Sequence, residues 1–174
     1  MIDVRKYRKA CKDYKDNWTL QDDTLYRLCK DNPGHSSLSV INAKSYIIGR
    51  VFAAGIGRIR SNSERVLAEN ILRNRKSVEP IFKRLSRVNE PLTEENLVVI
   101  VEEHGRFLKI LKEGLNGRTP RSFASKYLHF HCPAVPIFDS VASGKLSDGQ
   151  RWNKKLEIFA VPKDVDRDYY RFAM

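Results

Sequence analysis

The chain has 174 residues, of which 41% are hydrophobic and 30% are charged, and its formal net charge is +11. This length suits one domain, or two small lobes that share a core, and the excess of Lys and Arg favours polyanionic partners, above all nucleic acid. The charged start and the lack of any long apolar run argue against a signal peptide and a membrane span, and three widely spaced cysteines are typical of reduced thiols. We therefore expect a cytoplasmic protein that does not contact membranes.

Apolar residues recur at helical spacing through most of the chain, and turn-forming residues separate the periodic stretches. Ser63 is a predicted helix cap, Pro80 falls in the first turn of a helix that restarts at Ser77, and Gly105 marks the junction of two helical stretches. In chain order the predicted helices cover residues 2–14, 18–29, 37–55, 64–76, 77–86, 93–115, 121–131 and 137–146, and a last one begins at 168.

The period-two alternation typical of strands is limited to one short stretch, LEIFAV. The sequence thus predicts an all-α protein with a compact multi-helix fold of about nine helices. We expect residues 1–174 to form a single α-helical domain. The alternative is a division into two small lobes, about 1–90 and 91–174, that flank a cleft.

An aspartate follows an apolar loop in the stretch PRSFASKYLHFHCPAVPIFDSVA, residues 120–142. Asp139 stands where the next helix is predicted to begin, and Asp is among the residues that favour the N-cap position. The same position suits a catalytic carboxylate, because a partly desolvated carboxylate at a helix N-terminus stays ionised and exerts a strong field. The two roles are compatible, since one oxygen can cap the helix while the other faces a substrate.

This stretch resembles the catalytic segment of the helix-hairpin-helix DNA glycosylase superfamily, in which a helix ends in an apolar loop and an aspartate begins the next helix. The resemblance extends faintly to NAKSYIIGRVFAAGIGR, which is similar to prokaryotic relatives of the 8-oxoguanine glycosylases; some glycosylase-like proteins of that kind act in phage defence. It implies a glycosylase-like fold, DNA as the partner and Asp139 as the catalytic carboxylate. Two features depart from the family: the hairpin is NGRTP, with one glycine, and the place of the lysine nucleophile falls at about Arg121.

The departure at Arg121 decides which reaction the resemblance implies. Arginine stays protonated and cannot form a Schiff base, so the expected enzyme is monofunctional and Arg121 would anchor a phosphate or a sugar. Asp139 would stabilise the positive charge that develops on the sugar as the base leaves, and it would orient the attacking water. We expect no cofactor in this reaction.

Excision of a base from duplex DNA requires the target nucleotide to be flipped into a pocket. Ser125 and His129 share one helix face at i and i+4, and Lys126 lies beside them, so these three side chains are candidates to contact the nucleotide. For Lys126 a solvated surface position is the competing interpretation. His129 also belongs to HFHC, residues 129–132, but a zinc site needs four ligands and we find no second pair, so no metal is predicted.

A basic stretch from Arg50 to Lys76 holds seven basic residues against two acidic ones. Arg58 and Arg60 flank a glycine turn, so we expect them to be exposed. Together with Arg50 they are predicted to contact the DNA backbone, and a merely solvated surface is the alternative.

Three functions remain open at this point. The first is a monofunctional DNA glycosylase-like enzyme that hydrolyses a base–sugar bond in damaged or modified DNA. The second is a catalytically inactive DNA- or protein-binding module of the same fold, such as a phage or mobile-element regulator, which the single-glycine hairpin and the missing lysine favour. The third is a helical interaction domain whose charge serves an acidic protein partner.

Overall fold

The computed structural model describes residues 4–52, 54, 56, 62–113, 115, 118–139, 143–144 and 165–173. Within these residues the regular secondary structure is helical, which confirms the all-α class. The helices are α1 (Val4–Asn17), α2 (Thr19–Asp31), α3 (Leu38–Arg50), α4 (Ser63–Arg73), α5 (Arg75–Leu85), α6 (Glu94–Leu111), α7 (Arg121–His131) and α9 (Arg167–Ala173). The described part of the chain therefore holds eight helices, and the glycosylase-like arrangement and the total of about nine stay predictions.

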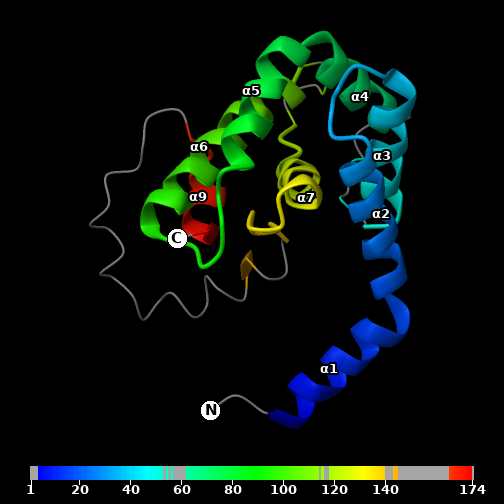
Figure 1. Cartoon of the computed structure of the whole chain (residues 1–174), viewed down its shortest axis with the longest axis vertical. Coiled ribbons are helices and arrows are strands. Elements are labelled where there is room, and N and C mark those ends of the chain that lie inside the picture. The colour runs from blue at the N-terminus through cyan, green and yellow to red at the C-terminus, as the bar shows by residue number, and fades with distance from the viewer. Residues whose placement is uncertain are drawn as a thin grey trace.

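Helix α7 lies in the middle of the molecule. In Figure 1, α2 and α3 lie on one side of α7 and α5 and α6 on the other, while α1 extends from α2 away from the remaining helices. Contacts join α7 to α2, α3 and α6, and α9 packs on α6. Any functional group on α7 is thus surrounded by elements from both halves of the chain.

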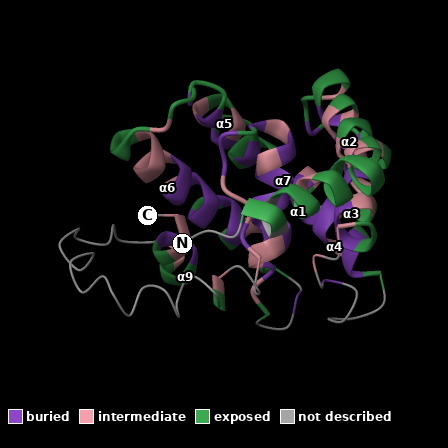
Figure 2. Ribbon diagram, turned by 90° about the horizontal axis from the view of Figure 1, so that it is seen from below, coloured by how far each residue is buried: buried purple, intermediate pink, exposed green. Residues whose placement is uncertain are grey.

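The buried position of α7 has a consequence for its polar residues. Residues 123–128 are buried without interruption, so α7 is surrounded by protein on all sides, as helices in the centre of a protein are. Figure 2 shows buried residues on α6 and α7 and mainly exposed residues on α1 and on the outer side of α2. Polar side chains on α7 must therefore find hydrogen-bond partners inside the protein.

Two helix boundaries differ from the prediction. Helix α6 runs without a break through Gly105, because His104 and Phe107 on both sides of the glycine are buried and their packing outweighs its weak helix propensity of about 1 kcal/mol. Helix α5 begins at Arg75, directly after a turn at Asn74, so Pro80 lies beyond the first turn.

The predicted helix over residues 137–146 starts too early. Residues 137–139 are not helical, and Ser143 and Gly144 are, with the N–H of Ser143 bonded to the carbonyl oxygen of Asp139 at 2.8 Å. The other residues of this segment, and the stretch LEIFAV, lie outside the described residues.

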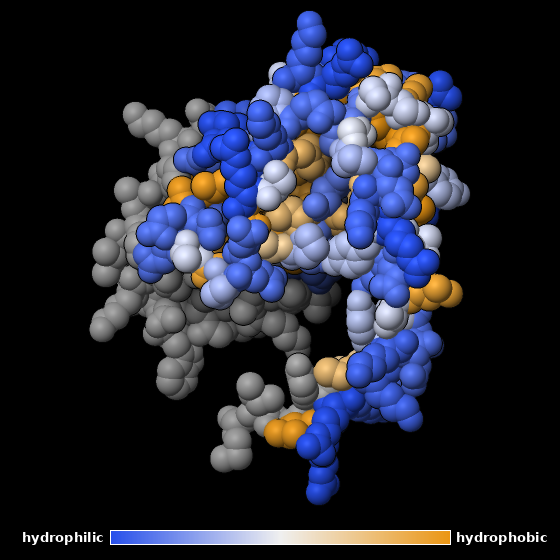
Figure 3. All heavy atoms as spheres, viewed as in Figure 1, coloured by the Kyte–Doolittle hydropathy of each residue, from blue (hydrophilic) through white to orange (hydrophobic). Residues whose placement is uncertain are grey.

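Among the described helices none combines the length and the apolar character needed to cross a membrane. On the face shown in Figure 3 hydrophilic side chains predominate, and apolar side chains lie among them.

Candidate functional site

The loop between α7 and Asp139 folds back along α7. The helix ends at His131, two residues before Pro133, whose ring and missing N–H disfavour a longer helix. A turn follows, in which the N–H of Val135 donates to the carbonyl oxygen of Cys132 at 3.0 Å. The chain therefore reverses, and the residue before Asp139 bonds to a side chain in the middle of α7.

Ser125 is the residue of α7 that holds this loop. Its side chain is fully buried, and its Oγ accepts a hydrogen bond from the N–H of Phe138 at 2.9 Å while donating to the carbonyl oxygen of Ser122 at 3.1 Å. The hydroxyl thus donates and accepts within the protein, as a buried polar group must. The structure gives Ser125 a role in fixing the position of Asp139, and its contact with a nucleotide stays a prediction.

Lys126 is buried beside Asp139, so the solvated surface position considered for Lys126 is wrong. The lysine is 8% exposed, and its Nζ donates to the carbonyl oxygen of Phe52, just after α3, at 2.6 Å. Burial lowers the pKa of Lys126, and the negative charge of Asp139 partly offsets that effect. Asp139 itself is half-buried. A poorly hydrated ammonium group therefore lies next to the end of α3, and it interacts with the charge of the partly exposed Asp139.

His129 uses both ring nitrogens inside the protein. Its Nδ1–H donates to the carbonyl oxygen of Val135 at 2.8 Å, and its Nε2 lies 2.5 Å from the hydroxyl of Tyr26, from which it accepts a hydrogen bond. Burial lowers the pKa of His129, which favours the neutral ring that this pattern requires. Like Ser125, His129 fixes the loop that leads to Asp139, and its contact with a nucleotide stays a prediction.

The other two residues of HFHC have separate partners. His131 donates from Nδ1 to the carbonyl oxygen of Tyr127 at 2.8 Å, and its Nε2 lies 3.0 Å from the Nζ of the buried Lys44. The thiol of Cys132 donates to the carbonyl oxygen of Leu85 at 3.3 Å. Protein groups thus engage both side chains.

Arg121, at the start of α7, lies in an ion-pair network with two aspartates. Its Nε and Nη2 donate to the two carboxylate oxygens of Asp166 at 2.6 and 2.9 Å, and Nη2 also lies 2.8 Å from Asp168. The guanidinium stands 5.2 Å from the ring centre of Phe138, the residue before Asp139. Burial acts to raise the pKa of Asp166, but the hydrogen bonds from Arg121 and from the N–H of Tyr169 outweigh it and hold this pKa below its ordinary value.

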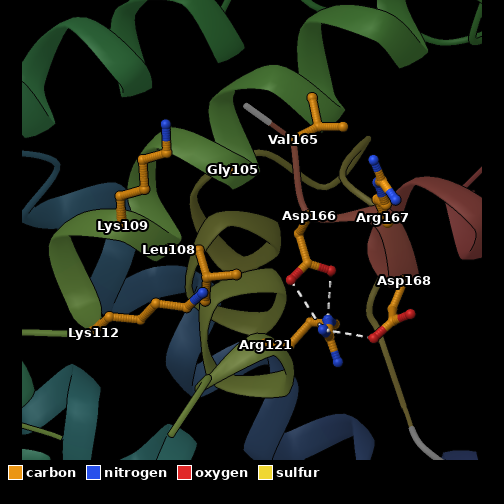
Figure 4. A pocket seen from close by; sticks show the side chains of 9 residues that line it. All are labelled: Gly105, Leu108, Lys109, Lys112, Arg121, Val165, Asp166, Arg167 and Asp168. Carbon is orange, nitrogen blue, oxygen red and sulfur yellow. Dashed lines mark hydrogen bonds and ion pairs between the residues drawn. The ribbon is translucent and has the colours of Figure 1, made fainter. Parts of the chain in front are cut away.

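A cleft of about 300 Å³ opens beside this network, between α6 and the start of α9 (Figure 4). Four basic and two acidic side chains line it: Lys109, Lys112, Arg121, Arg167, Asp166 and Asp168. In Figure 4 the side chain of Lys112 extends from the end of α6 in the direction of Arg121. The excess of positive charge around the cleft suits an anionic group such as a phosphate.

Arg50 ends α3, the helix whose C-terminal end Lys126 approaches. Its Nε lies 2.7 Å from the carboxylate of Glu64, its guanidinium is 5.8 Å from the ring centre of Tyr46, and 53% of its side chain is exposed. This exposure leaves Arg50 accessible to a phosphate, and its contact with DNA stays a prediction. Arg58 and Arg60 lie outside the described residues.

The partners that come from the end of the chain were not predictable from the sequence. Asp166, Asp168 and Tyr169 lie around Arg121 and the loop before Asp139. The only sequence signal was the close spacing of acidic and aromatic residues in DVDRDYYRF, which does not say what they contact.

Comparisons of the chain with protein-family models, with curated proteins and with solved structures give no match.

Proposed function

We propose that the protein is a monofunctional DNA glycosylase-like enzyme that hydrolyses a base–sugar bond in damaged or modified DNA, with Asp139 as the essential carboxylate. The observation that carries the proposal is the position of Asp139: half-buried, at the end of a loop fixed to the central helix, and beside the charge of Lys126. A carboxylate that is held in place and only partly hydrated can stabilise a cationic sugar without first reorganising its surroundings.

The charges around Asp139 support DNA as the partner. Arg50 is half exposed at the end of α3. Arg121, which lines the basic cleft, lies 5.2 Å from the ring centre of Phe138, the residue before Asp139. Together with the net charge of +11, these basic groups favour contact with the phosphates of a nucleic acid. The resemblance of residues 120–142 to helix-hairpin-helix glycosylases supports the same partner and the same carboxylate.

The chemistry assigns separate tasks to the residues around the bond. Asp139 stabilises the positive charge on the sugar and orients the attacking water. Lys126 is engaged by the carbonyl oxygen of Phe52, and its positive charge interacts with the carboxylate of Asp139. Arg121 cannot form a Schiff base, so excision leaves an intact abasic site. We place the reaction in the cytoplasm, with defence against phages that carry modified DNA as one setting.

The experiment is an excision assay of the purified chain on duplexes that each carry one damaged or modified base, with alkali cleavage to reveal abasic sites. We expect strand cleavage that depends on alkali for at least one duplex. A borohydride-trapped covalent complex would show that an amine, with Lys126 the first candidate, acts as a nucleophile, and the monofunctional assignment would then be wrong.

A second candidate function is a DNA-binding or protein-binding module of this fold without catalysis. The ion-pair network of Arg121 favours this module. Two aspartates already pair with the guanidinium that is predicted to anchor the substrate. Binding of DNA without excision of any base in the panel would support the module.

A further inference from the structure

Tyr169 connects the last helix to the loop that carries Asp139. Its hydroxyl donates a hydrogen bond to the carbonyl oxygen of Pro136 at 2.8 Å. Proline has no backbone N–H, so this carbonyl is the only backbone hydrogen-bonding group at that position. Together with the bonds from His129 to Val135 and from Phe138 to Ser125, the contact fixes the loop at three of the four residues that precede Asp139.

Tyr169 is itself held firmly. Its side chain is fully buried, and its ring stacks on His104 with centroids 3.6 Å apart and planes inclined by 13°. Its backbone N–H donates to the carboxylate of Asp166 at 2.8 Å, and Asp166 is paired with Arg121. A hydroxyl on a ring that is fixed in this way defines where its acceptor must lie.

The residue before Asp139 is also held from the side of α9. The rings of Phe138 and Phe172 meet edge to face with centroids 5.2 Å apart, and the guanidinium of Arg121 lies 5.2 Å from the ring centre of Phe138. Phe138 therefore touches both the start of α7 and helix α9. The orientation of the next residue depends on α9 as well as on α7.

The phenol of Tyr169 acts as a hydrogen-bond donor and not as an acid or base. Burial raises the pKa of Tyr169 well above its ordinary value. The hydroxyl consequently keeps its proton at neutral pH and can donate it to the carbonyl oxygen of Pro136.

We propose that Tyr169 is a positioning residue: its hydroxyl fixes the orientation of the backbone from Pro136 to Asp139, and through it the direction of the Asp139 carboxylate. The proposal rests on the function proposed above for Asp139. It makes helix α9 a part of the candidate site, because α9 supports the loop that carries Asp139.

The test uses Tyr169→Phe, which keeps the ring and its stack on His104 and removes only the donor. Tyr170→Phe is the matched control, because it removes a hydroxyl from a buried tyrosine one residue along the same helix. Hydrogen exchange of the Phe138 N–H reports on the loop, and single-turnover excision and DNA affinity report on the site. In Tyr169→Phe we expect exchange about ten-fold faster and excision roughly ten- to hundred-fold slower, with unchanged DNA affinity.

A double variant with Asp139→Asn separates positioning from general damage. Because Tyr169 acts through Asp139, the double variant should excise no more slowly than Asp139→Asn alone. Wild-type exchange and wild-type excision in Tyr169→Phe would overturn the proposal, and so would equal effects in Tyr170→Phe.

Failure of the proposed function gives a different pattern. If the unaltered protein excises no base, Asp139 is not a catalytic carboxylate and the proposed function is wrong. Faster exchange at Phe138 in Tyr169→Phe, without a change in Tyr170→Phe, would still support the control of this loop by Tyr169, and equal exchange in all three proteins would overturn it.

Discussion

Ser125 and Phe138 are joined by a hydrogen bond of 2.9 Å from the Phe138 N–H to the serine Oγ, inside the protein. The bond ties the chain just before Asp139 to the most buried helix. It makes the position of the candidate carboxylate a property of the core, and not of a free surface loop. A site placed on such a support can keep its geometry to within the small tolerance that catalysis demands.

Ser125→Ala should therefore affect both stability and excision. The substitution leaves the buried N–H of Phe138 without its acceptor, and we expect a loss of about 1–3 kcal/mol in the free energy of unfolding. Excision per folded molecule should also slow. Urea unfolding and single-turnover kinetics measure the two effects. Ser122→Ala is the control, because the carbonyl oxygen that accepts from Ser125 belongs to its backbone and survives. Equal behaviour of the two variants would contradict the account.

Arg121→Gln tests whether the guanidinium serves the fold or the DNA. The change leaves Asp166, whose side chain is 8% exposed, without its bidentate partner. We expect the free energy of unfolding to fall by about 2–4 kcal/mol, since an unpaired buried charge is costly. Addition of Asp166→Asn should restore most of the loss, because the amide that replaces the carboxylate carries no charge. If this stable double variant binds DNA as the unaltered protein does, Arg121 is a structural residue; weaker binding supports the predicted phosphate contact.

The stability of the protein should fall on acidification because of buried histidines. Burial lowers the pKa of His104 to about 4, from about 6.5 in the unfolded chain. The folded state therefore binds fewer protons than the unfolded state between these values, so the contribution is fully present above pH 6.5 and is lost as the pH falls toward 4. For His104 the loss is about 3 kcal/mol.

His104→Phe checks this contribution, because phenylalanine keeps a ring to stack on Tyr169 and cannot take up a proton. Between pH 6 and 4.5, urea unfolding of the variant should show a slope of stability against pH that is smaller by about 1 kcal/mol per pH unit. His35 and His131, whose pKa values burial lowers to about 4 and about 3, account for part of the slope that remains. An unchanged slope would mean that His104 is already protonated in the folded protein.

Arg58 and Arg60 should contribute to DNA binding through phosphate contacts. Replacing both with Gln is expected to weaken binding to all sequences and to reduce the slope of log affinity against log salt by about 0.9 for each lost contact. The control replaces Arg27 and Lys30 on the exposed side of α2, which removes the same charge. Fluorescence anisotropy at several salt concentrations measures both. Equal slopes for the two double variants would remove Arg58 and Arg60 from the interface.

Local patterns in the sequence were sufficient for most of the helices, although the loop before Asp139 extends further than predicted. The start of α7 after Pro120 and its end before Pro133 follow from local chemistry, so they could be predicted. The partners of the site residues could not. The bond from Lys126 to Phe52 joins residues 74 positions apart, and that from Arg121 to Asp166 joins residues 45 apart.

The same limit explains the error on Lys126. A lysine between polar and apolar residues on a helix has the pattern of a surface residue, because helix periodicity shows which residues share a face and not how many faces are covered. Helix α7 is covered on all sides, so even its lysine is buried. Only the packing of α3 against α7 provides the carbonyl oxygen that makes this burial tolerable.

The proposed reaction depends on the negative charge of Asp139. Asp139→Asn removes that charge and keeps the size of the side chain, and Asp31→Asn at the exposed end of α2 is the control for the loss of one carboxylate. The measurement is the single-turnover rate of base excision, taken together with the free energy of unfolding and the DNA affinity. We predict a rate about a hundred-fold to a thousand-fold lower for Asp139→Asn, because the charge that stabilises the cationic sugar is gone. Its stability should change by no more than about 1 kcal/mol, since Asn can still cap a helix, and its DNA affinity should be equal or tighter. An Asp139→Asn variant that excises at the normal rate per folded molecule would contradict the account.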